Sequence, residues 1–367
     1  MDAGLLYQNA KVKSRESGLL GADRLQRISD AATVEEAMRL LAEANYPSGA
    51  SCDEVLAAAE REASLLFKSC MTKGYGLEFF LLTDDYHNAK VAAKAAYFGG
   101  AKEGYKPEGS VSVSALEEAL AKGEYKEIPQ GIAACYVALD KLRSKDALVP
   151  SAVDVALDKA AFEEIKAKRK SAAKVIGKYF DLLADLKNVS VAYRARKAEF
   201  SVEKAKDMFL PMGNIAVKDL LKIAEFGEDA AEKIASGGFV KEALSVLKEG
   251  VTAYEVYADN ALLALLKKER YDMFSPAPIA GLYIGKLREI KNVRLLLARN
   301  YDIIFITEQF AEKLPDLIAR YKTRPFPAVI PMPSASGSTG YGRSLVKADV
   351  EKAIGTDILQ VEEKKDD

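Results

Sequence analysis

The stretch of this sequence with the clearest potential for chemistry is a glycine- and hydroxyl-rich loop, S-A-S-G-S-T-G-Y-G-R-S, that runs from Ser334 to Ser344. A predicted strand precedes it and a predicted helix follows it, which is where a glycine loop can hold a phosphate group at a helix N-terminus. The loop lacks the G-K-[ST] ending of a P-loop and the G-x-G-x-x-G spacing of a dinucleotide-binding turn. Two interpretations stay open, a nucleotide site and an ordinary surface loop.

Nucleophilic and metal-based chemistry find little support in the residue types. The only histidine, His87, has no neighbouring cluster of His, Cys or Asp, which is typical of a structural residue rather than a ligand. Cys52, Cys70 and Cys135 are widely spaced and lack C-x-x-C pairs, which indicates free thiols in a reducing compartment. No Ser or Cys can be assigned to a histidine-based nucleophile system. We therefore predict no catalytic, cofactor-binding or metal-binding residues.

A short polar motif recurs along the chain. An acid followed three positions later by asparagine, here called an acid–Asn box, occurs at Asp85–Asn88, Asp185–Asn188 and Glu289–Asn292. Successive boxes lie about a hundred residues apart, and a copy without the acid opens the chain at Asn9. At this spacing on a helix the acid and the amide share one face. We interpret the boxes as repeated polar pairs for helix packing, not as catalytic carboxylates.

Other elements recur in the same order as the boxes. Amphipathic segments that begin with valine, at Val34, Val113 and Val217, follow Asn9, Asn88 and Asn188 after about 25 to 29 residues. Further helices are predicted at residues 19–25, 34–44, 52–71, 77–97, 150–169, 172 to beyond 188, and 276–299, the last being one of two helices expected within residues 251–299. Repetition at a long, nearly constant period predicts three copies of one all-helical unit within residues 1–299.

The helix at residues 276–299 is the most regular element, and the architecture changes after it. Pro276 and Pro278 suit a first helical turn, and apolar residues then recur at helical period. Beyond it we predict a strand at 302–307, a helix at 308–321, a strand at 328–331, a loop at 333–343 and a helix at 344–353. This order predicts parallel strands in a partial α/β domain at residues 300–359. Residues 360–367 are predicted to form a charged tail.

Composition excludes several functional classes. The 367 residues carry 53 Lys and Arg against 54 Asp and Glu, so no global field favours nucleic acid or anionic lipid. No apolar run approaches the ~20 residues that a membrane-spanning helix needs, and no signal peptide is evident. Two basic runs, at residues 166–174 and 194–197, fit solvated helix faces, with contact to an acidic partner as the alternative. We expect a cytoplasmic protein unless a partner holds it at a membrane.

The boxes and the last helix resemble a known family. The segment SPAPIAGLYIGKLREIKNVRLLLA, residues 275–298, resembles the C-terminal signature of the C subunit of the rotary A/V-type ATP synthases, known in eukaryotes as the d subunit or AC39 family. The similarity covers about residues 1–298, including the opening Asn9-Ala10-Lys11. It implies three related helical domains arranged as a funnel. In that family the funnel sits on the cytoplasmic end of the membrane rotor ring and connects it to the central axle.

The residues after 300 resemble the second half of the F subunit of the same complex. The shared segments are I-I-x-I-T-E at 303–308, P-A-V-I-P-M-P at 327–333, S-T-G-Y-G at 338–342 and K-A-I-G-T-D-I at 352–358. That family is a small, non-catalytic, Rossmann-like protein of the central stalk. The last helical segment of the first family and the N-terminal strand–helix portion of the second are missing here. An in-frame deletion or a gene-model join would give such a fusion.

The resemblance implies a non-catalytic central-stalk protein in ATP-driven or ATP-producing transport of H⁺ or Na⁺. It would be peripheral, at the cytoplasmic face of the membrane, with the proteolipid rotor ring and other stalk proteins as partners and without nucleic acid. A nucleotide-binding regulator or enzyme that uses residues 334–344 is the alternative, and a generic helical scaffold is a second one. Since two strands alone are marginal, residues 300–359 should be less stable than 1–298. Proteases should cut first near 297–301 or within 334–343.

Overall fold

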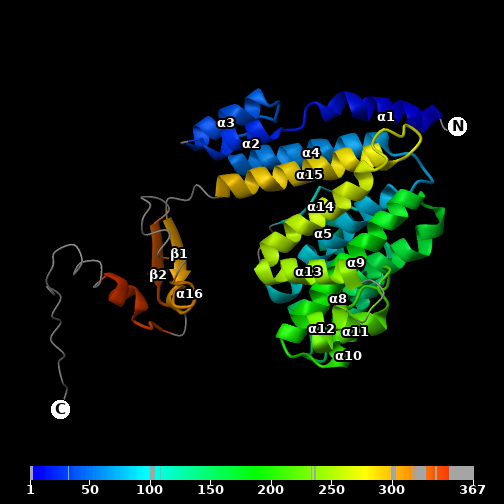
Figure 1. The fold of residues 1–367 in the computed structure, drawn as a ribbon. Helices are drawn as coiled ribbons and strands as arrows, with labels where there is room; N and C mark the ends of the chain where they lie inside the picture. Colours follow the sequence, from blue (N-terminus) through cyan, green and yellow to red (C-terminus); the bar gives the residue numbers. More distant parts are fainter. Residues whose placement is uncertain are drawn as a thin grey trace, which may run out of the picture. The chain divides into compact units, whose positions relative to one another are not determined.

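The computed structural model describes residues 3–31, 33–99, 104–107, 109–232, 234, 237–298, 303–315, 318, 328–334 and 337–346. The chain forms two compact units. One comprises Met1–Leu20 with Asn45–Ile290, and the other comprises Gly21–Ala44 with Lys291–Asp367. The described residues are mainly helical, as the sequence predicts, with a single small parallel sheet (Figure 1).

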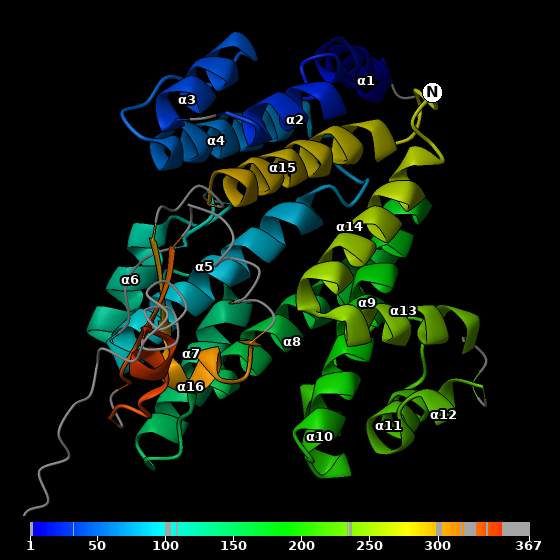
Figure 2. The ribbon, with the colours of Figure 1, turned by 60° about the vertical axis from the view of Figure 1, so that its left-hand side comes forward.

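All the regular secondary structure in the described part of the first unit is helical. Its helices are α1 (Ala3–Glu16), α4 (Cys52–Cys70), α5 (Glu78–Phe98), α6 (Val113–Lys122), α7 (Gln130–Arg143), α8 (Pro150–Lys168), η1 (Arg169–Ser171), α9 (Lys174–Lys197), α10 (Val202–Met208), α11 (Val217–Phe226), α12 (Glu228–Ala231), α13 (Gly237–Glu249), α14 (Val251–Lys267) and the first part of α15 (Ala277–Ala298). Figure 2 shows α4 and α15 side by side, with α10, α11 and α13 packed against α9.

Local chemistry fixes where several of these helices begin and end. The hydroxyls of Ser51, Ser112 and Ser201 each accept a hydrogen bond from the N–H three residues on, which satisfies one of the unpaired donors of the first turn. Helices α5 and α6 end at Gly99 and Gly123, whose φ angles of 70° and 67° glycine adopts without steric cost.

The core of the first unit contains an aromatic cluster on four helices. Phe80 of α5 contacts the rings of Phe67 (α4), Tyr179 and Phe180 (α9) and Tyr283 (α15), at centroid distances of 5.7, 5.1, 5.1 and 6.5 Å. Phe67 also stacks on Tyr283 at 4.3 Å. The helices that carry the three acid–Asn boxes, α5, α9 and α15, therefore meet around one buried phenyl ring.

The second unit contains α2 (Ala22–Ser29) and α3 (Val34–Glu43), which pack against each other, and a small α/β segment. In that segment β1 (Ile303–Thr307) leads into α16 (Glu308–Ala311), and β2 (Ala328–Met332) pairs with β1. The strands are parallel, in a register that places Phe305 opposite Ile330 and Thr307 opposite Met332. The predicted parallel pairing is confirmed. Residues 341–346 are helical.

Most predicted helix positions agree with the structure to within a few residues, with three exceptions. The helix predicted at 19–25 is wrong in position, because α2 starts at Ala22 and the Leu20 N–H donates to the Glu289 carboxylate instead of joining a helix. Helix α16 ends at Ala311, and only residues 315 and 318 are helical among those described before β2. The final helix starts at 341, before the predicted 344, while 347–353, the junction at 299–302 and the tail at 360–367 lie outside the described residues.

Candidate functional site

The box on α5 holds the chain segment that leads into α6. The Asp85 carboxylate, 1% exposed, accepts hydrogen bonds from the backbone N–H of Ser110 at 2.9 Å and of Val111 at 3.2 Å. The Asn88 side chain accepts from the Lys106 N–H at 2.9 Å and donates to the Lys106 carbonyl at 3.1 Å. The acid and the amide thus serve as partners for backbone that has left regular structure, which would otherwise carry unpaired polar groups.

The box on α9 makes the same kinds of contact. The Asp185 carboxylate, 4% exposed, accepts from the N–H of Asn214 at 2.8 Å and of Ile215 at 2.9 Å. Asn188 accepts from the Leu210 N–H at 2.7 Å and donates to its carbonyl at 3.2 Å. Burial raises the pKa of Asp185, and the N–H donors of Ile215 and Asn214 act in the opposite direction.

A glycine precedes the donor residue in both boxes. A Cβ at Gly109 or Gly213 would collide with the carboxylate of Asp85 or Asp185, so only glycine lets the backbone approach so closely. Each glycine opens a short pattern before the following helix, G-S-V-S-V in one case and G-N-I-A-V in the other. This repeated G-x-[VI]-x-V pattern was available in the sequence and would have located the partners of the boxes.

The third box uses partners from the beginning of the chain. Glu289 accepts from the Leu20 N–H, the Tyr46 hydroxyl and the Lys286 ammonium group, each at 2.6 Å. Asn292, the asparagine of this box, is half-buried, and it lies past the boundary at residue 290 where the chain passes from the first unit to the second. The acid-free copy also differs, because the Asn9 side chain donates to the carbonyls of Met273 and Ser275, just before α15, at 2.8 and 2.9 Å.

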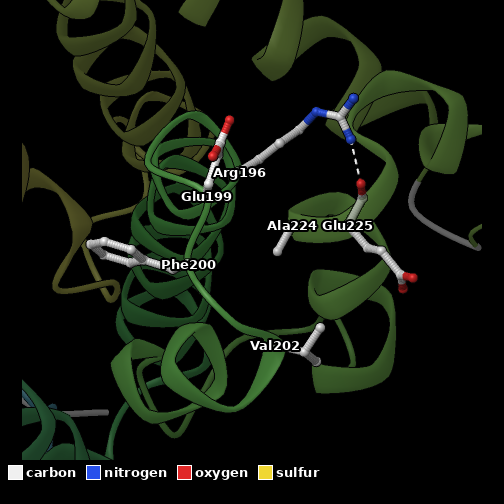
Figure 3. Close-up of a pocket in the computed structure, with 6 residues that line it drawn as sticks. All are labelled: Arg196, Glu199, Phe200, Val202, Ala224 and Glu225. Carbon is white, nitrogen blue, oxygen red and sulfur yellow. Dashed lines mark hydrogen bonds between the residues drawn. The ribbon is translucent and has the colours of Figure 1, made fainter.

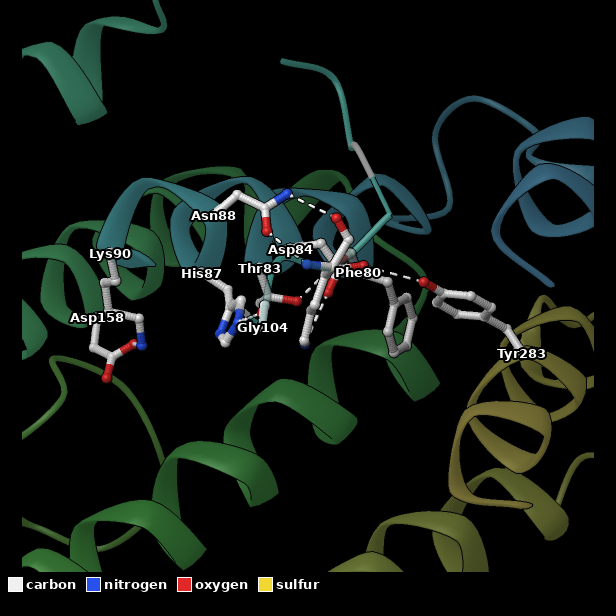
Figure 4. Close-up of polar contacts among 10 residues, drawn as sticks. Phe80, Thr83, Asp84, His87, Asn88, Lys90, Gly104, Asp158 and Tyr283 are labelled. Atoms are coloured by element: carbon white, nitrogen blue, oxygen red, sulfur yellow. Dashed lines mark hydrogen bonds and ion pairs between the residues drawn. The ribbon is translucent and has the colours of Figure 1, made fainter. Parts of the chain in front are cut away.

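A second buried carboxylate connects α5 with α15. Asp84 accepts from the Tyr283 hydroxyl at 3.0 Å (Figure 4). It also accepts from the Lys106 ammonium group at 2.9 Å. The contact with Tyr283 lies beside the ring of Phe80, so a polar and an aromatic contact join the same two helices. Lys90 of α5 forms an ion pair with Asp158 of α8 at 2.7 Å, which adds a third helix to the connection.

His87 also takes part in holding backbone. Its Nε2 lies 2.9 Å from the Gly104 carbonyl oxygen, and the ring is half-buried (Figure 4). Burial lowers the pKa of His87, and the nearby Lys106 and Lys90 lower it further, against the opposing effect of the Gly104 carbonyl. The cysteines are free thiols, and among the described residues no group of three or more His, Cys, Asp and Glu could hold a metal ion. These contacts favour a structural role for His87.

The glycine loop of the α/β segment has its donors directed at a carboxylate. The Glu308 side chain accepts from the Ser338 hydroxyl at 2.7 Å and from the N–H groups of Thr339 at 2.6 Å and Gly342 at 3.0 Å. These donors lower the pKa of Glu308, with the Ser338 hydrogen bond as the main cause. The carboxylate takes the position that a phosphate would need, so a bound phosphate would have to displace a charge of its own sign.

A surface cavity of about 400 Å³ lies beside one of the basic runs (Figure 3). Its lining residues are Arg196, Glu199, Phe200, Val202, Ala224 and Glu225. The Arg196 guanidinium donates to the Glu225 carbonyl at the end of α11, where a cation offsets the negative end of the helix dipole. In the other basic run Arg169 is paired with Asp181. These two cations therefore have partners within the chain.

The fold and its contacts define a mainly helical protein in which buried carboxylates and amides hold loops to helices. The chain belongs to the family of the ATP synthase (C/AC39) subunit, whose model matches residues 8–300. The model of the ATP synthase (F/14-kDa) subunit matches residues 279–350, so one polypeptide carries parts of both proteins. The two matches overlap at residues 279–300, within and just beyond α15.

Individual relatives agree with both family matches. The F subunit of the V-type ATP synthase of Fusobacterium nucleatum is 44% identical over 69 residues, 19% of this chain and 66% of that protein. The corresponding protein of Clostridium botulinum is 36% identical over 76 residues, 21% of this chain and 74% of that protein. The C subunit of the A-type ATP synthase of Desulfurococcus is 24% identical over 317 residues, 79% of this chain and 85% of that protein. The chain thus spans slightly less than two thirds of the Fusobacterium protein.

Proposed function

We propose that this chain is a non-catalytic central-stalk subunit of a rotary A/V-type ATPase, in which the helical domain links a membrane rotor ring to the central axle. Membership of the C/AC39 family over residues 8–300, with an F/14-kDa match behind it, carries the proposal. The partners are the proteolipid ring and other central-stalk proteins. The location is peripheral, at the cytoplasmic face of the membrane, in a complex that moves H⁺ or Na⁺. No described helix is both long and apolar enough to cross a bilayer.

The internal contacts support a mechanical role. A coupling protein must transmit torque without bending, and the joints within a helical domain, between helices or between a helix and a loop, stay rigid when buried polar groups are fully paired. The contacts of Asp84, Asp85 and Asp185 have this character, because each carboxylate is almost fully buried and accepts two or more hydrogen bonds. Phe80 adds close-packed aromatic contacts where the box helices meet.

We further propose that residues 1–299 contain three related helical units in a funnel-like arrangement. The matching contacts of the boxes on α5 and α9, including the glycine before each donor, support two of the units. In the third, Glu289 accepts from Leu20, near the start of the chain. Residues 300–359 would then be a partial, Rossmann-like domain of the F/14-kDa family, with 360–367 as its tail.

The nucleotide-binding alternative is less favourable on physical grounds. The donors of the glycine loop serve the Glu308 carboxylate, and the loop lacks the lysine of a P-loop, with Arg343 as its one cation. Purified chain should therefore hydrolyse no ATP. Hydrolysis that is lost on Gly340→Val, a change that strains the backbone at a φ of 80°, would support the enzyme interpretation instead.

The direct test is binding to a rotor ring. Purified full-length chain would be mixed with detergent-solubilised proteolipid ring from a bacterial V-type ATPase and separated by size-exclusion chromatography. We expect the chain to elute with the ring and to stay soluble without it. The double variant Asp85→Ala/Asp185→Ala should bind more weakly if the attachment of loops to helices α5 and α9 must be rigid. The matched control is Asp207→Ala, which removes an exposed carboxylate. Failure of the parent chain to bind would contradict the coupling role.

A further inference from the structure

The small parallel sheet has one face exposed to solvent. Phe305 of β1 is 64% exposed, and its register partner Ile330 on β2 is 40% exposed. Met332, two residues along β2 and therefore on the same side, is 46% exposed. Ile306 and Val329, whose side chains alternate to the other side, are less exposed, and α16 packs against both strands. Parallel sheets are normally covered on both faces, whereas the described residues leave this apolar face without a cover.

The two edges of the sheet differ in how well they are protected against pairing with a further strand. Within the described residues the sheet has only the strands β1 and β2, so each has a free edge. β2 contains Pro331, which cannot donate to a further strand and is a residue that protein edges use to prevent pairing. β1, with the sequence I-I-F-I-T, has neither proline nor charge. Its edge is therefore the one suited to accept another strand.

We propose that the exposed face and the free edge of β1 bind a strand–helix unit from a second polypeptide. A strand on that edge would give the sheet three strands, the number at which small sheets become stable. An amphipathic helix would cover Phe305, Ile330 and Met332. The unit should resemble the part of the F/14-kDa protein that this chain lacks. The Fusobacterium protein has about 35 residues beyond the matched 66%, enough for one strand and one helix, since a whole βαβ unit takes about 30.

The proposal rests on the F/14-kDa match and not on ring binding, so the two can fail separately. The probe is a fluorescently labelled polypeptide made of the residues of the Fusobacterium nucleatum protein that this chain does not match. Full-length chain would be titrated against it by fluorescence anisotropy, with hydrogen exchange measured across residues 303–307 and 328–332. We expect saturable binding, together with slower exchange in both strands.

A pair of matched variants locates the interface. Phe305→Glu places a charge on the exposed face and should raise the Kd at least about tenfold. Leu65→Glu, on α4 and 65% exposed, introduces the same charge at an equally exposed apolar residue and should leave the Kd unchanged. Because both side chains are exposed, neither change should unfold the chain, and far-UV circular dichroism would verify this.

Four results would overturn the proposal. They are no binding of the probe, equal weakening by both variants, strands that exchange slowly without the probe, and self-association of the chain that protects β1. The third result would mean that another part of the same chain covers the face. The fourth would assign the face to a second copy of the chain.

Discussion

Removing the Asp185 carboxylate is the sharpest test of the idea that acid–Asn boxes hold loops to helices. In Asp185→Ala the N–H groups of Asn214 and Ile215 lose their acceptor, in a place where the missing side chain was 4% exposed. The alanine side chain has no oxygen that could accept these hydrogen bonds instead. The segment between α9 and α11 should therefore loosen before the rest of the helical unit does.

The magnitude follows from the number of donors affected. A buried donor left without a partner costs about 1–3 kcal/mol, and the part-buried N–H of Asn214 costs less than the buried N–H of Ile215, so the two together cost about 2–5 kcal/mol. Part of this is offset, because alanine removes a carboxylate whose raised pKa shows that its burial is itself unfavourable. We expect a net loss of about 2–4 kcal/mol, a large part of the 5–15 kcal/mol that typically holds a domain folded. Asp185→Asn, which keeps one acceptor oxygen, should lose roughly half as much.

The assay is urea unfolding followed by circular dichroism, with hydrogen exchange at residues 210–215 as the local measurement. Asp85→Ala should behave in the same way, with faster exchange at the amides of Lys106, Ser110 and Val111, because its contacts match. Asp207→Ala, at an exposed aspartate, should change the unfolding free energy by less than about 0.5 kcal/mol. A loss for Asp185→Ala no larger than that of Asp207→Ala would refute the reasoning.

Three further outcomes are expected. Burial lowers the pKa of His87, so the neutral ring stabilises the fold fully above about pH 6.5. This stabilisation is lost as pH falls below that value, because the unfolded chain binds the proton first. The difference between the urea midpoints at pH 7.5 and 5.5 should shrink in His87→Gln, and an unchanged difference would contradict this. Tyr283→Phe keeps the ring contacts but removes the hydrogen bond to Asp84, which should cost about 1.5–3 kcal/mol in urea unfolding, and a loss below about 0.5 kcal/mol would show the bond to be unimportant. Glu289→Ala should speed hydrogen exchange at Leu20 at least tenfold (about 1.4 kcal/mol), and unchanged exchange would mean that Glu289 does not hold this segment.

Local patterns predicted the helices that carry the boxes because those helices have strong boundaries. Pro276 and Pro278 mark the start of α15, and Gly99 marks the end of α5. Helices α1, α7, α10, α12 and α13 were not predicted. Two of them, α10 and α12, have only seven and four residues, too few for a periodic pattern to stand out.

The contacts of the boxes were harder to predict than their positions. The sequence indicated polar pairs for helix packing, whereas the structure directs each acid at backbone N–H groups. Those of Asp85 and Asp185 lie 25 to 30 residues further along the chain. The backbone N–H that Glu289 accepts from, at Leu20, is 269 residues away, a separation over which periodicity and propensity give no information. Likewise nothing in the S-T-G-Y-G segment alone indicated that Glu308 would accept its donors.

The resemblance to the two families implies that a helical segment and part of a sheet are missing near residue 300, and these two losses would have different physical consequences. After Asn292 the sequence predicts that a valine-led helix is missing, and an unpartnered Glu289 in the interior would be costly. The Leu20 N–H and the Tyr46 hydroxyl satisfy that carboxylate, so this buried acid stays paired. The sheet has no comparable replacement among the described residues, since Phe305 and Ile330 remain exposed. Apolar burial is what stabilises a small sheet, so residues 300–359 should open at lower urea concentrations than residues 1–298 and should gain stability only when a partner covers the exposed face.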